Sequence, residues 1–396
     1  MPTAVIVDAV RTAGGKRNGK LSGWHPADLA AEVLKAIAER NQLDPSLIDD
    51  VIMGCVMQVG DQGVNIGRNA VLAAGWPESV PATSIDRQCG SSQQAAHFAA
   101  QGVMAGAYDI VVAAGVEVMS TTPMGASMIP GSFPFGPKVM ERYAPVGGLV
   151  PQGISAELIA DKWNLSREDL DAFGARSQQL AEKATAEHRF DNEIIPIKGR
   201  LKDRETGNLV ELDELVTADE GIRPGTTTET LGKLKPAFKP DGKITAGNSS
   251  QITDGAAAVL IMSEERANQL GLRPRARFHT FALAGVDPVM MLTGPIPATT
   301  RAFERSGLSM GDMDVVEINE AFASVVLAWE KEHHPDMARV NPNGGAIALG
   351  HPLGCSGAKL MATLLNELER SGGRYGLQTM CEGGGMANAT IIERLG

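Results

Sequence analysis

Short apolar runs alternate with helical patterns through the first part of the chain. The runs are rich in β-branched side chains and have the length of buried strands. Strands are predicted at residues 4–10, 50–56, 83–86 and 109–114. Helices are predicted at residues 26–38 and 91–105, where apolar side chains recur at helical spacing. Because strands alternate with helices, the pattern predicts a parallel α/β core.

The second half of the chain repeats this plan. Residues 311–322 resemble residues 46–57, because in both an acidic turn leads into an apolar strand with a polar exit. Residues 340–368 resemble residues 83–104, since each is a turn that leads into a helix. A helix at 299–306 and closing strands within 375–395 complete the repeat. We therefore expect two similar α/β halves that arise from an internal duplication.

The material between the halves is different, because it is rich in Gly, Pro, Met and charged side chains. It contains predicted helices at 156–162 and 167–187, the second with Ser166 as its N-cap. Such a stretch is too long for a loop and indicates a lid subdomain. A turn, a helix and a strand at 245–265 are expected to return the chain to the first half. The predicted domains are 1–120 with 246–270 (N-terminal half), 121–245 (inserted loop domain) and 271–396 (C-terminal half).

Composition and charge narrow the possible functions. The chain has 396 residues and a net charge of −11, which argues against a nucleic-acid partner. Its longest uncharged apolar run, 255–262, is far shorter than a membrane span. We recognise no secretory signal, so we expect a cytoplasmic protein whose four cysteines are free thiols. The cysteines lack CxxC spacing, so no metal site is expected.

Cys89 lies in the stretch DRQCGSSQQA, between a predicted strand and a predicted helix. At a helix N-terminus the dipole and the free backbone N–H groups favour a thiolate. The thiolate is the form of cysteine that attacks a carbonyl carbon. The alternative is that Cys89 is a buried and inert cysteine.

His351 lies in the glycine-rich stretch NGGAIALGHPLGCSGAKL. The glycines allow the backbone to approach a ligand closely. Histidine is the usual side chain for accepting a thiol proton near neutral pH. The alternative is a core histidine with both ring nitrogens hydrogen-bonded. We interpret Cys355, four residues further on, as a packing residue.

Two further stretches carry polar groups at the ends of strands. Cys381 precedes three glycines in CEGGGMANATII, and such a loop can aim backbone N–H groups at a developing oxyanion. A second thiol can also act as an acid or base, although a plain glycine turn is the simpler alternative. Asn319 ends an apolar strand in NEAF, where its amide can hold a water or a carbonyl and Glu320 can orient a neighbour.

Taken together, these stretches resemble the thiolase family over essentially the whole chain. The matching motifs are CGSSQQA, NEAFA, GHPLGCSGAK and CEGGGM, in the same order and with an insertion between the halves. The resemblance implies a five-layer αβαβα thiolase fold made of two similar halves, with a loop domain that covers a coenzyme A site.

The resemblance also implies ping-pong acyl transfer. Cys89 attacks the ketone of a 3-oxoacyl-CoA, His351 accepts its proton, and Cys381 protonates the departing acetyl-CoA at its α-carbon. Coenzyme A then takes the shortened acyl group, and the reverse reaction is a Claisen condensation. One oxyanion hole is formed by His351 with a water on Asn319, and the other by the backbone N–H groups of Cys89 and Gly383.

Contacts with coenzyme A are implied for Arg223 near the adenine and phosphates, Ser250 at the pantetheine and Met291 along the acyl pocket. The alternatives are a solvated arginine, a turn serine and a core methionine. Coenzyme A is a substrate here, so no cofactor is expected. The resemblance further implies a homodimer or a homotetramer.

Pro151 and Gln152 depart from the family pattern, since biosynthetic acetoacetyl-CoA thiolases have His-Met at this point. The departure favours a degradative enzyme of fatty acid or steroid catabolism that takes a longer or bulkier chain. Three alternatives stay open. They are a biosynthetic acetoacetyl-CoA thiolase, a thiolase-like lipid carrier without turnover, and a ketosynthase. Ketosynthases resemble a Cys-His-His set, and Cys381 at the third position here counts against that alternative.

Overall fold

One path of paired strands runs through both halves of the computed structural model, which describes residues 2–203 and 205–396. In the N-terminal half the strand order is β4-β3-β5-β8-β1. These strands are β1 (Ala4–Arg11), β3 (Asp50–Gly54), β4 (Ala82–Ile85), β5 (Ile110–Val118) and β8 (Thr253–Ser263). The four strands predicted for this half are confirmed.

The predicted parallel core is wrong in one respect, because the sheet is mixed. β3 pairs in parallel with β4 and β5, whereas β8 is antiparallel to both β5 and β1. The reason is that β8 enters the sheet from the inserted segment and not through a crossover helix. A two-residue strand, β2 (Gly15–Lys16), also pairs with β8.

The C-terminal half repeats the same order and the same strand directions. Its path is β10-β11-β12-β9, formed by β9 (Ala276–Gly285), β10 (Val315–Ile318), β11 (Tyr375–Glu382) and β12 (Met386–Arg394). An isolated parallel bridge between Val316 and Val340 takes the place that β4 has in the first half. The two halves meet where β1 and β9 pair over two residues. The predicted internal repeat is therefore confirmed.

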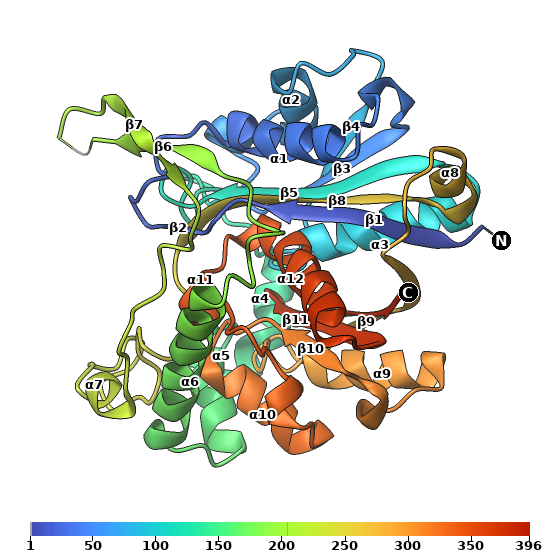
Figure 1. Cartoon of the computed structure of the whole chain (residues 1–396). Helices are drawn as coiled ribbons and strands as arrows, with labels where there is room; N and C mark the ends of the chain where they lie inside the picture. The colour runs from blue at the N-terminus through green and yellow to red at the C-terminus, as the bar shows by residue number, and fades with distance from the viewer. Residues whose placement is uncertain (1, 204) are drawn as a thin grey trace.

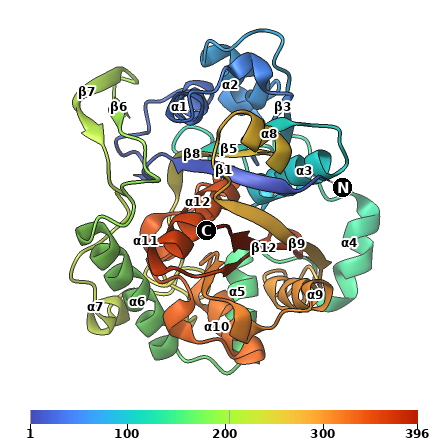
Figure 2. The same ribbon diagram turned by 45° about the vertical axis from the view of Figure 1, so that its right-hand side comes forward.

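Helices separate and cover these strands in five layers, as predicted (Figure 1). On the outer face of the N-terminal half lie α1 (Pro26–Arg40) and α2 (Ile66–Ala73). Between the halves lie α3 (Ser91–Met104) and α12 (Ser356–Ser371), and the turned view shows α12 between β1 and β12 (Figure 2). The last layer contains α9 (Pro295–Ser306) and α10 (Ala323–His333). Four of the ten buried residues of α3 are alanines, and they belong to the apolar cluster of this middle layer.

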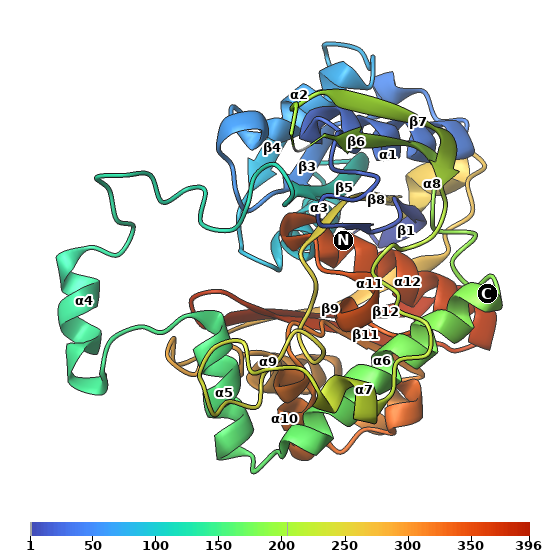
Figure 3. The same cartoon turned by 90° about the vertical axis from the view of Figure 1, so that its left-hand side faces the viewer.

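The inserted segment forms α4 (Pro137–Tyr143), α5 (Gln152–Lys162), α6 (Arg167–Ala186), a hairpin of β6 (Ile197–Lys202) and β7 (Leu209–Val216), and α7 (Thr228–Gly232). The two predicted helices are confirmed, and Ser166 caps α6 by accepting the N–H of Asp169 at 3.0 Å. The segment between β5 and α5, which contains α4, is called the α4 arm here. Figure 3 shows it standing away from the rest of the molecule. Within the described residues, no helix is long and apolar enough to cross a membrane.

One prediction in this region is wrong. Residues 245–252, directly before β8, form no helix, and the short helix α8 (Glu264–Gln269) follows β8 instead. The polar side chains of residues 245–249 bind the local backbone: Asn248 accepts the Thr245 N–H at 2.8 Å, and Ser249 donates to the Thr245 carbonyl at 2.7 Å. Such bonds compete with a helix. The predicted domain bounds stay a prediction.

The N-termini of α3 and α12 meet backbone to backbone at the centre of the molecule. The N–H of Ala358 donates to Ser92 Oγ at 2.9 Å. A side chain on Gly357 would overlap the backbone of Gln93, and one on Gly54 would overlap the backbone of Ser92. Glycine is therefore required where these two helices begin.

This contact gives the first prediction. Gly357→Ala places a methyl group against the Gln93 backbone, so we expect the free energy of unfolding to fall by about 1–3 kcal/mol. Urea denaturation followed by circular dichroism measures the change. The matched control is Gly232→Ala, where the new Cβ meets no atom within 4 Å and stability should not fall. Equal stability of the two variants would contradict this account of the helix contact.

Candidate active site

The loop before α3 presents Cys89 in a constrained turn. Gln88 has a φ of 48°, a left-handed conformation that is uncommon for a non-glycine residue. Asp86 fixes this turn by accepting the Gln88 N–H at 2.6 Å. The Gln88 carbonyl in turn accepts the N–H of Ser91, which begins the helix. Cys89 is therefore held rigidly at the N-terminus of α3.

The sulfur of Cys89 lies in a buried but polar setting. The backbone N–H groups of Cys89 and Gly383 both act to lower the pKa of this thiol, so the structure brings these two predicted site residues together. Burial, followed by the nearby carboxylate of Glu382, raises the pKa of Cys89 to about 12. Desolvation thus outweighs the helix dipole and the nearby N–H groups, the features that the sequence analysis expected to favour a thiolate. Cys89 rests as a thiol that needs a base.

His351 is held in one tautomer. Its Nδ1 lies 2.6 Å from Ser356 Oγ, and that hydroxyl donates its own proton to the Pro352 carbonyl at 2.8 Å. Nδ1 must therefore carry the hydrogen, and Nε2 keeps a lone pair. The Asn319 amide lies 3.4 Å from Nε2. Burial lowers the pKa of His351 to about 3, so the ring is neutral and free to accept a proton.

Asn319 and Cys381 come from neighbouring strands. Asn319 follows β10, and its N–H donates to the Thr379 carbonyl of β11 at 3.1 Å. Cys381 is near the end of β11 and is buried. Burial and the charge of a Cys89 thiolate raise the pKa of Cys381, so ionisation of one thiol opposes ionisation of the other. One sulfur can act as a nucleophile while the other keeps its proton.

Glu320 serves the architecture of the site. Its carboxylate accepts hydrogen bonds from Ser177 Oγ at 2.5 Å, Asn341 Nδ2 at 2.9 Å and the Ile347 N–H at 3.2 Å. Ile347 belongs to α11 (Ala346–Leu349), the short helix that precedes His351. Glu320 thus orients neighbours across three segments, as its place in NEAF indicated.

The sequence analysis missed Glu382. Its side chain is fully buried, and neither carboxylate oxygen finds a hydrogen-bond partner among the described residues. It lies against Gly90, where any Cβ would overlap its carboxylate. Burial raises the pKa of Glu382 to about 8. The available signal was a carboxylate directly after Cys381, within a motif that was read for its glycines.

The three residues proposed to contact coenzyme A are less closely grouped. Ser250 adjoins the NEAF stretch, because its N–H donates to the Ala321 carbonyl at 2.9 Å. Arg223 is exposed, and its backbone N–H donates to Gln178. Met291 is buried and has a φ of 35°. Their roles toward coenzyme A stay predictions.

Cys355 packs between the two halves in the described structure. It belongs to the apolar cluster of the middle layer and is 1% exposed. Burial raises the pKa of its thiol to about 12. The described residues contain no group of three or more His, Cys, Asp or Glu side chains that could hold a metal ion.

Comparisons with known proteins agree with this geometry. Residues 4–265 match the family model described as thiolase, N-terminal domain, and residues 272–394 match thiolase, C-terminal domain. The chain belongs to the thiolase family. The resemblance that the four motifs indicated is thereby confirmed.

Several thiolases are similar over their full length. A steroid 3-ketoacyl-CoA thiolase of Mycobacterium tuberculosis is 51% identical over 100% of this chain and 95% of its own. A 3-ketoacyl-CoA thiolase of Psychrobacter cryohalolentis is 46% identical over 99% of this chain and 98% of its own. The crystal structure of the Bacillus anthracis acetyl-CoA acetyltransferase matches with a TM-score of 0.89 and 39% identity, covering 100% of this chain and 99% of that chain.

The pKa of Glu382 gives a pH-dependent prediction. Above about pH 8 its carboxylate opposes ionisation of Cys89, whereas below that pH the carboxyl is already neutral. Glu382→Gln should therefore speed alkylation of Cys89 by iodoacetamide severalfold at about pH 9.5 and leave it unchanged at about pH 6. Peptide mapping identifies the modified thiol.

The matched control is Glu304→Gln, which removes an exposed carboxylate from α9. It should leave the alkylation rate of Cys89 unchanged at both pH values. An equal rate for Glu382→Gln and the native protein at the higher pH would show that this carboxylate does not influence the thiol.

Proposed function

We propose that this chain is a 3-oxoacyl-CoA thiolase, an acetyl-CoA C-acyltransferase. It uses coenzyme A to cleave a 3-oxoacyl-CoA into acetyl-CoA and a shortened acyl-CoA, through an acyl group on Cys89. The observation that carries the proposal is the arrangement of the site: Cys89 stands directly before α3, Asn319 lies 3.4 Å from His351 Nε2, and the second thiol, Cys381, is close enough to respond to the charge of Cys89.

The first half-reaction uses three side chains. Cys89 Sγ attacks the ketone carbon and gives its proton to His351 Nε2, the nitrogen left free by the bond to Ser356. The tetrahedral alkoxide then collapses, and the bond between the α- and β-carbons breaks. Cys381 gives its proton to the α-carbon, so acetyl-CoA leaves and the acyl group stays on Cys89.

The second half-reaction restores the protons. The thiol of a new coenzyme A gives its proton to the Cys381 thiolate and attacks the thioester carbon. The oxyanion that forms on the thioester accepts from the N–H groups of Cys89 and Gly383. When the intermediate collapses, Cys89 leaves as a thiolate and takes its proton back from His351. The reverse sequence is the Claisen condensation.

The alkoxide of the first step has different donors. Once His351 is protonated, its Nε2–H can donate, and the neighbouring Asn319 amide can hold a water as a second donor. Removal of one such hydrogen-bond donor typically lowers kcat by about 10²–10³-fold. The buried setting strengthens both interactions.

We place the acyl substrate among chains larger than acetoacetyl. Gln152 supports this, because it begins α5 and a Cβ on Gly383 would lie 3.5 Å from its amide nitrogen. Gln152, which departs from the pattern of short-chain thiolases, thus lies beside Gly383, a proposed donor to the thioester oxyanion. The relatives at 45–51% identity have names that refer to 3-ketoacyl-CoA, one of them to steroids, which supports a degradative role. The acetyltransferase fold match keeps the biosynthetic alternative as a second candidate.

We also propose a cytoplasmic homodimer or homotetramer. β4 lies at the edge of its sheet and offers an unpaired backbone edge that a second copy can extend. The α4 arm carries exposed apolar side chains that a further contact would cover, among them Ile129, Phe133, Phe135 and Met140. Coenzyme A and 3-oxoacyl-CoA complete the set of proposed partners.

Intact-protein mass spectrometry tests the chemistry. Acetyl-CoA should leave an acetyl adduct on Cys89, and a long-chain or steroid-derived 3-oxoacyl-CoA should leave the shortened acyl group there. Cys89→Ser should give no thioester adduct. Cys381→Ala should slow acetyl transfer from acetyl-CoA, where Cys381 protonates the leaving coenzyme A thiolate, and should lose thiolysis by at least about a hundredfold, because the carbon–carbon step also needs its proton.

The matched control is Cys355→Ala, a buried cysteine outside the proposed chemistry, which should keep both reactions. Comparison of loading rates for acetoacetyl-CoA and for a bulky 3-oxoacyl-CoA separates the two candidate substrates. Binding of coenzyme A with no adduct on Cys89 from any substrate would reject catalysis and support the carrier alternative.

A further inference from the structure

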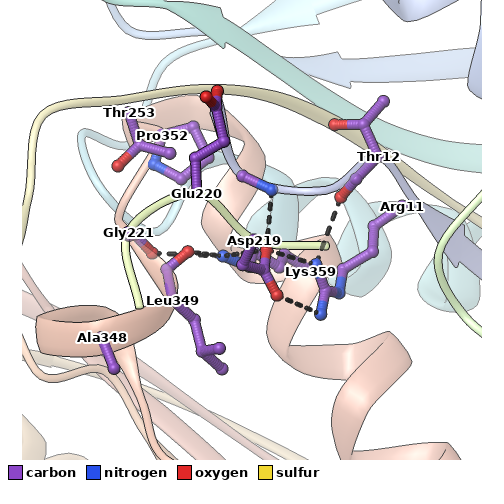
Figure 4. A network of polar contacts seen from close by, with 12 residues as sticks. Arg11, Thr12, Asp219, Glu220, Gly221, Thr253, Ala348, Leu349, Pro352 and Lys359 are labelled. Carbon is purple, nitrogen blue, oxygen red and sulfur yellow. Dashed lines mark hydrogen bonds and ion pairs between the residues drawn. The ribbon is translucent and has the colours of Figure 1, made fainter. Parts of the chain in front are cut away.

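Lys359 is a buried cation behind the active site that the proposed reaction does not use. It lies one turn into α12, and its side chain is 6% exposed. Its ammonium donates to the carbonyls of Leu349 and Gly350, the two residues directly before His351 (Figure 4). Gly350 has a φ of 81°, a conformation that glycine adopts readily and that directs the chain into His351. Lys359 thus supports the turn that carries the catalytic imidazole.

A buried ionic cluster fixes the position of Lys359. Asp219 Oδ1 lies 3.8 Å from its ammonium and also accepts from Arg11 at 2.8 Å and from the Gly14 N–H at 2.7 Å. Arg11 in turn binds Glu193 at 2.7 Å. Two cations and two anions therefore balance one another, which is the condition under which buried charges are tolerated. Figure 4 shows Asp219 between Arg11 and Lys359.

The chain segment that follows Asp219 is also joined to the His351 turn by hydrogen bonds of Gln251. The Gln251 side-chain amide donates to the carbonyls of Gly221 and Ile347, both at 2.8 Å. The Gln251 backbone carbonyl accepts the N–H of His351 at 3.3 Å. Residues 219–223, which end at the proposed coenzyme A residue Arg223, are thus joined to the turn on both sides.

A small cavity lies between Lys359 and the back of the site. Its volume is about 10 Å³, enough for one water molecule, and Glu317, Asn319, Ser356 and Lys359 are among its lining residues. Glu317 is buried, and one of its oxygens has no partner among the described residues. Burial and the surrounding carboxylates raise the pKa of Glu317 well above its usual value, so its negative charge is disfavoured on the side of the cavity.

We propose that Lys359 is a positioning residue for His351, which fixes the turn that carries the imidazole and keeps the ring unprotonated until Cys89 delivers its proton. The inference rests on the proposed role of His351 as the base. Its electrostatic part has independent support, because Lys359 follows burial among the causes that lower the pKa of His351. Burial lowers the pKa of Lys359, and the charged or titratable groups that face it are Asp219, Arg11, Cys355 and Glu193, of which both carboxylates favour its charged form.

The test measures the titration of His351 in the full-length protein. Nitrogen-15 NMR of labelled histidine reports protonation and tautomer, and His351→Asn identifies the signal. In the native protein the ring should stay neutral, with hydrogen on Nδ1, down to about pH 5. Lys359→Gln and Lys359→Met both remove the charge, so in both the midpoint should rise by at least about one pH unit.

Kinetics separates the effect of the carbonyl contacts of Lys359 from the effect of its charge. Lys359→Met also loses both carbonyl contacts, so acylation of Cys89 by acetyl-CoA should slow by at least about tenfold, with a smaller change in KM. Lys359→Gln keeps a donor for these carbonyls and should retain more of the rate. Glu193→Gln is the matched control, because it perturbs the same cluster without contacting the His351 turn. It should not raise the midpoint.

The outcomes are distinct. A midpoint that rises in both Lys359 variants and not in Glu193→Gln supports the proposal. An unchanged midpoint in a folded Lys359 variant, or an equal rise in the control, overturns it. Thermal melting establishes folding, and Lys359→Gln carries the test if Lys359→Met does not fold. Failure of the proposed function would appear differently, as a native protein whose Cys89 accepts no acyl group.

Discussion

The active site depends on the backbone contact between the N-termini of α3 and α12. Cys89 stands directly before one helix and His351 shortly before the other, so their separation is set by how closely the helices approach. That approach requires glycine at Gly357, where a side chain would overlap the backbone of α3, and at Gly54 of β3, where a side chain would overlap Ser92 and the Gly354 carbonyl. Because each helix comes from a different half, the duplicated fold creates at its centre a site that neither half contains alone.

Burial then decides how the site rests between reactions. It raises the pKa of the Cys89 and Cys381 thiols and lowers that of His351, so both sulfurs keep their protons and the ring stays neutral. In the proposed mechanism, negative charge develops in the site only after a substrate with a carbonyl oxygen has bound. In the proposed second half-reaction the donors for the thioester oxyanion are backbone N–H groups that are already in place, so no reorganisation is needed at that moment.

Local patterns predicted most of the fold. The strands, the capped helix after Ser166, the two similar halves and the thiolase motifs were all visible in the sequence, because each depends on neighbours within a few residues. The helix expected before β8 failed because side chains such as Asn248 bind the nearby backbone. The effect of burial on the pKa of Cys89 was not visible in the sequence, because desolvation is set by the whole fold. Lys359 and Asp219 stayed undetected because their pairing spans 140 residues of chain.

The most direct test of this account is a crystal structure of the protein trapped as the acetyl-enzyme with acetyl-CoA. The account predicts a thioester on Cys89 whose carbonyl oxygen accepts from the N–H groups of Cys89 and Gly383. It also predicts that the Cys381 sulfur faces the α-carbon of the second acetyl group, with His351 Nε2 directed at the reacting centre. An acetyl group on Cys381 or Cys355, or a thioester oxygen directed away from Gly383, would contradict the account.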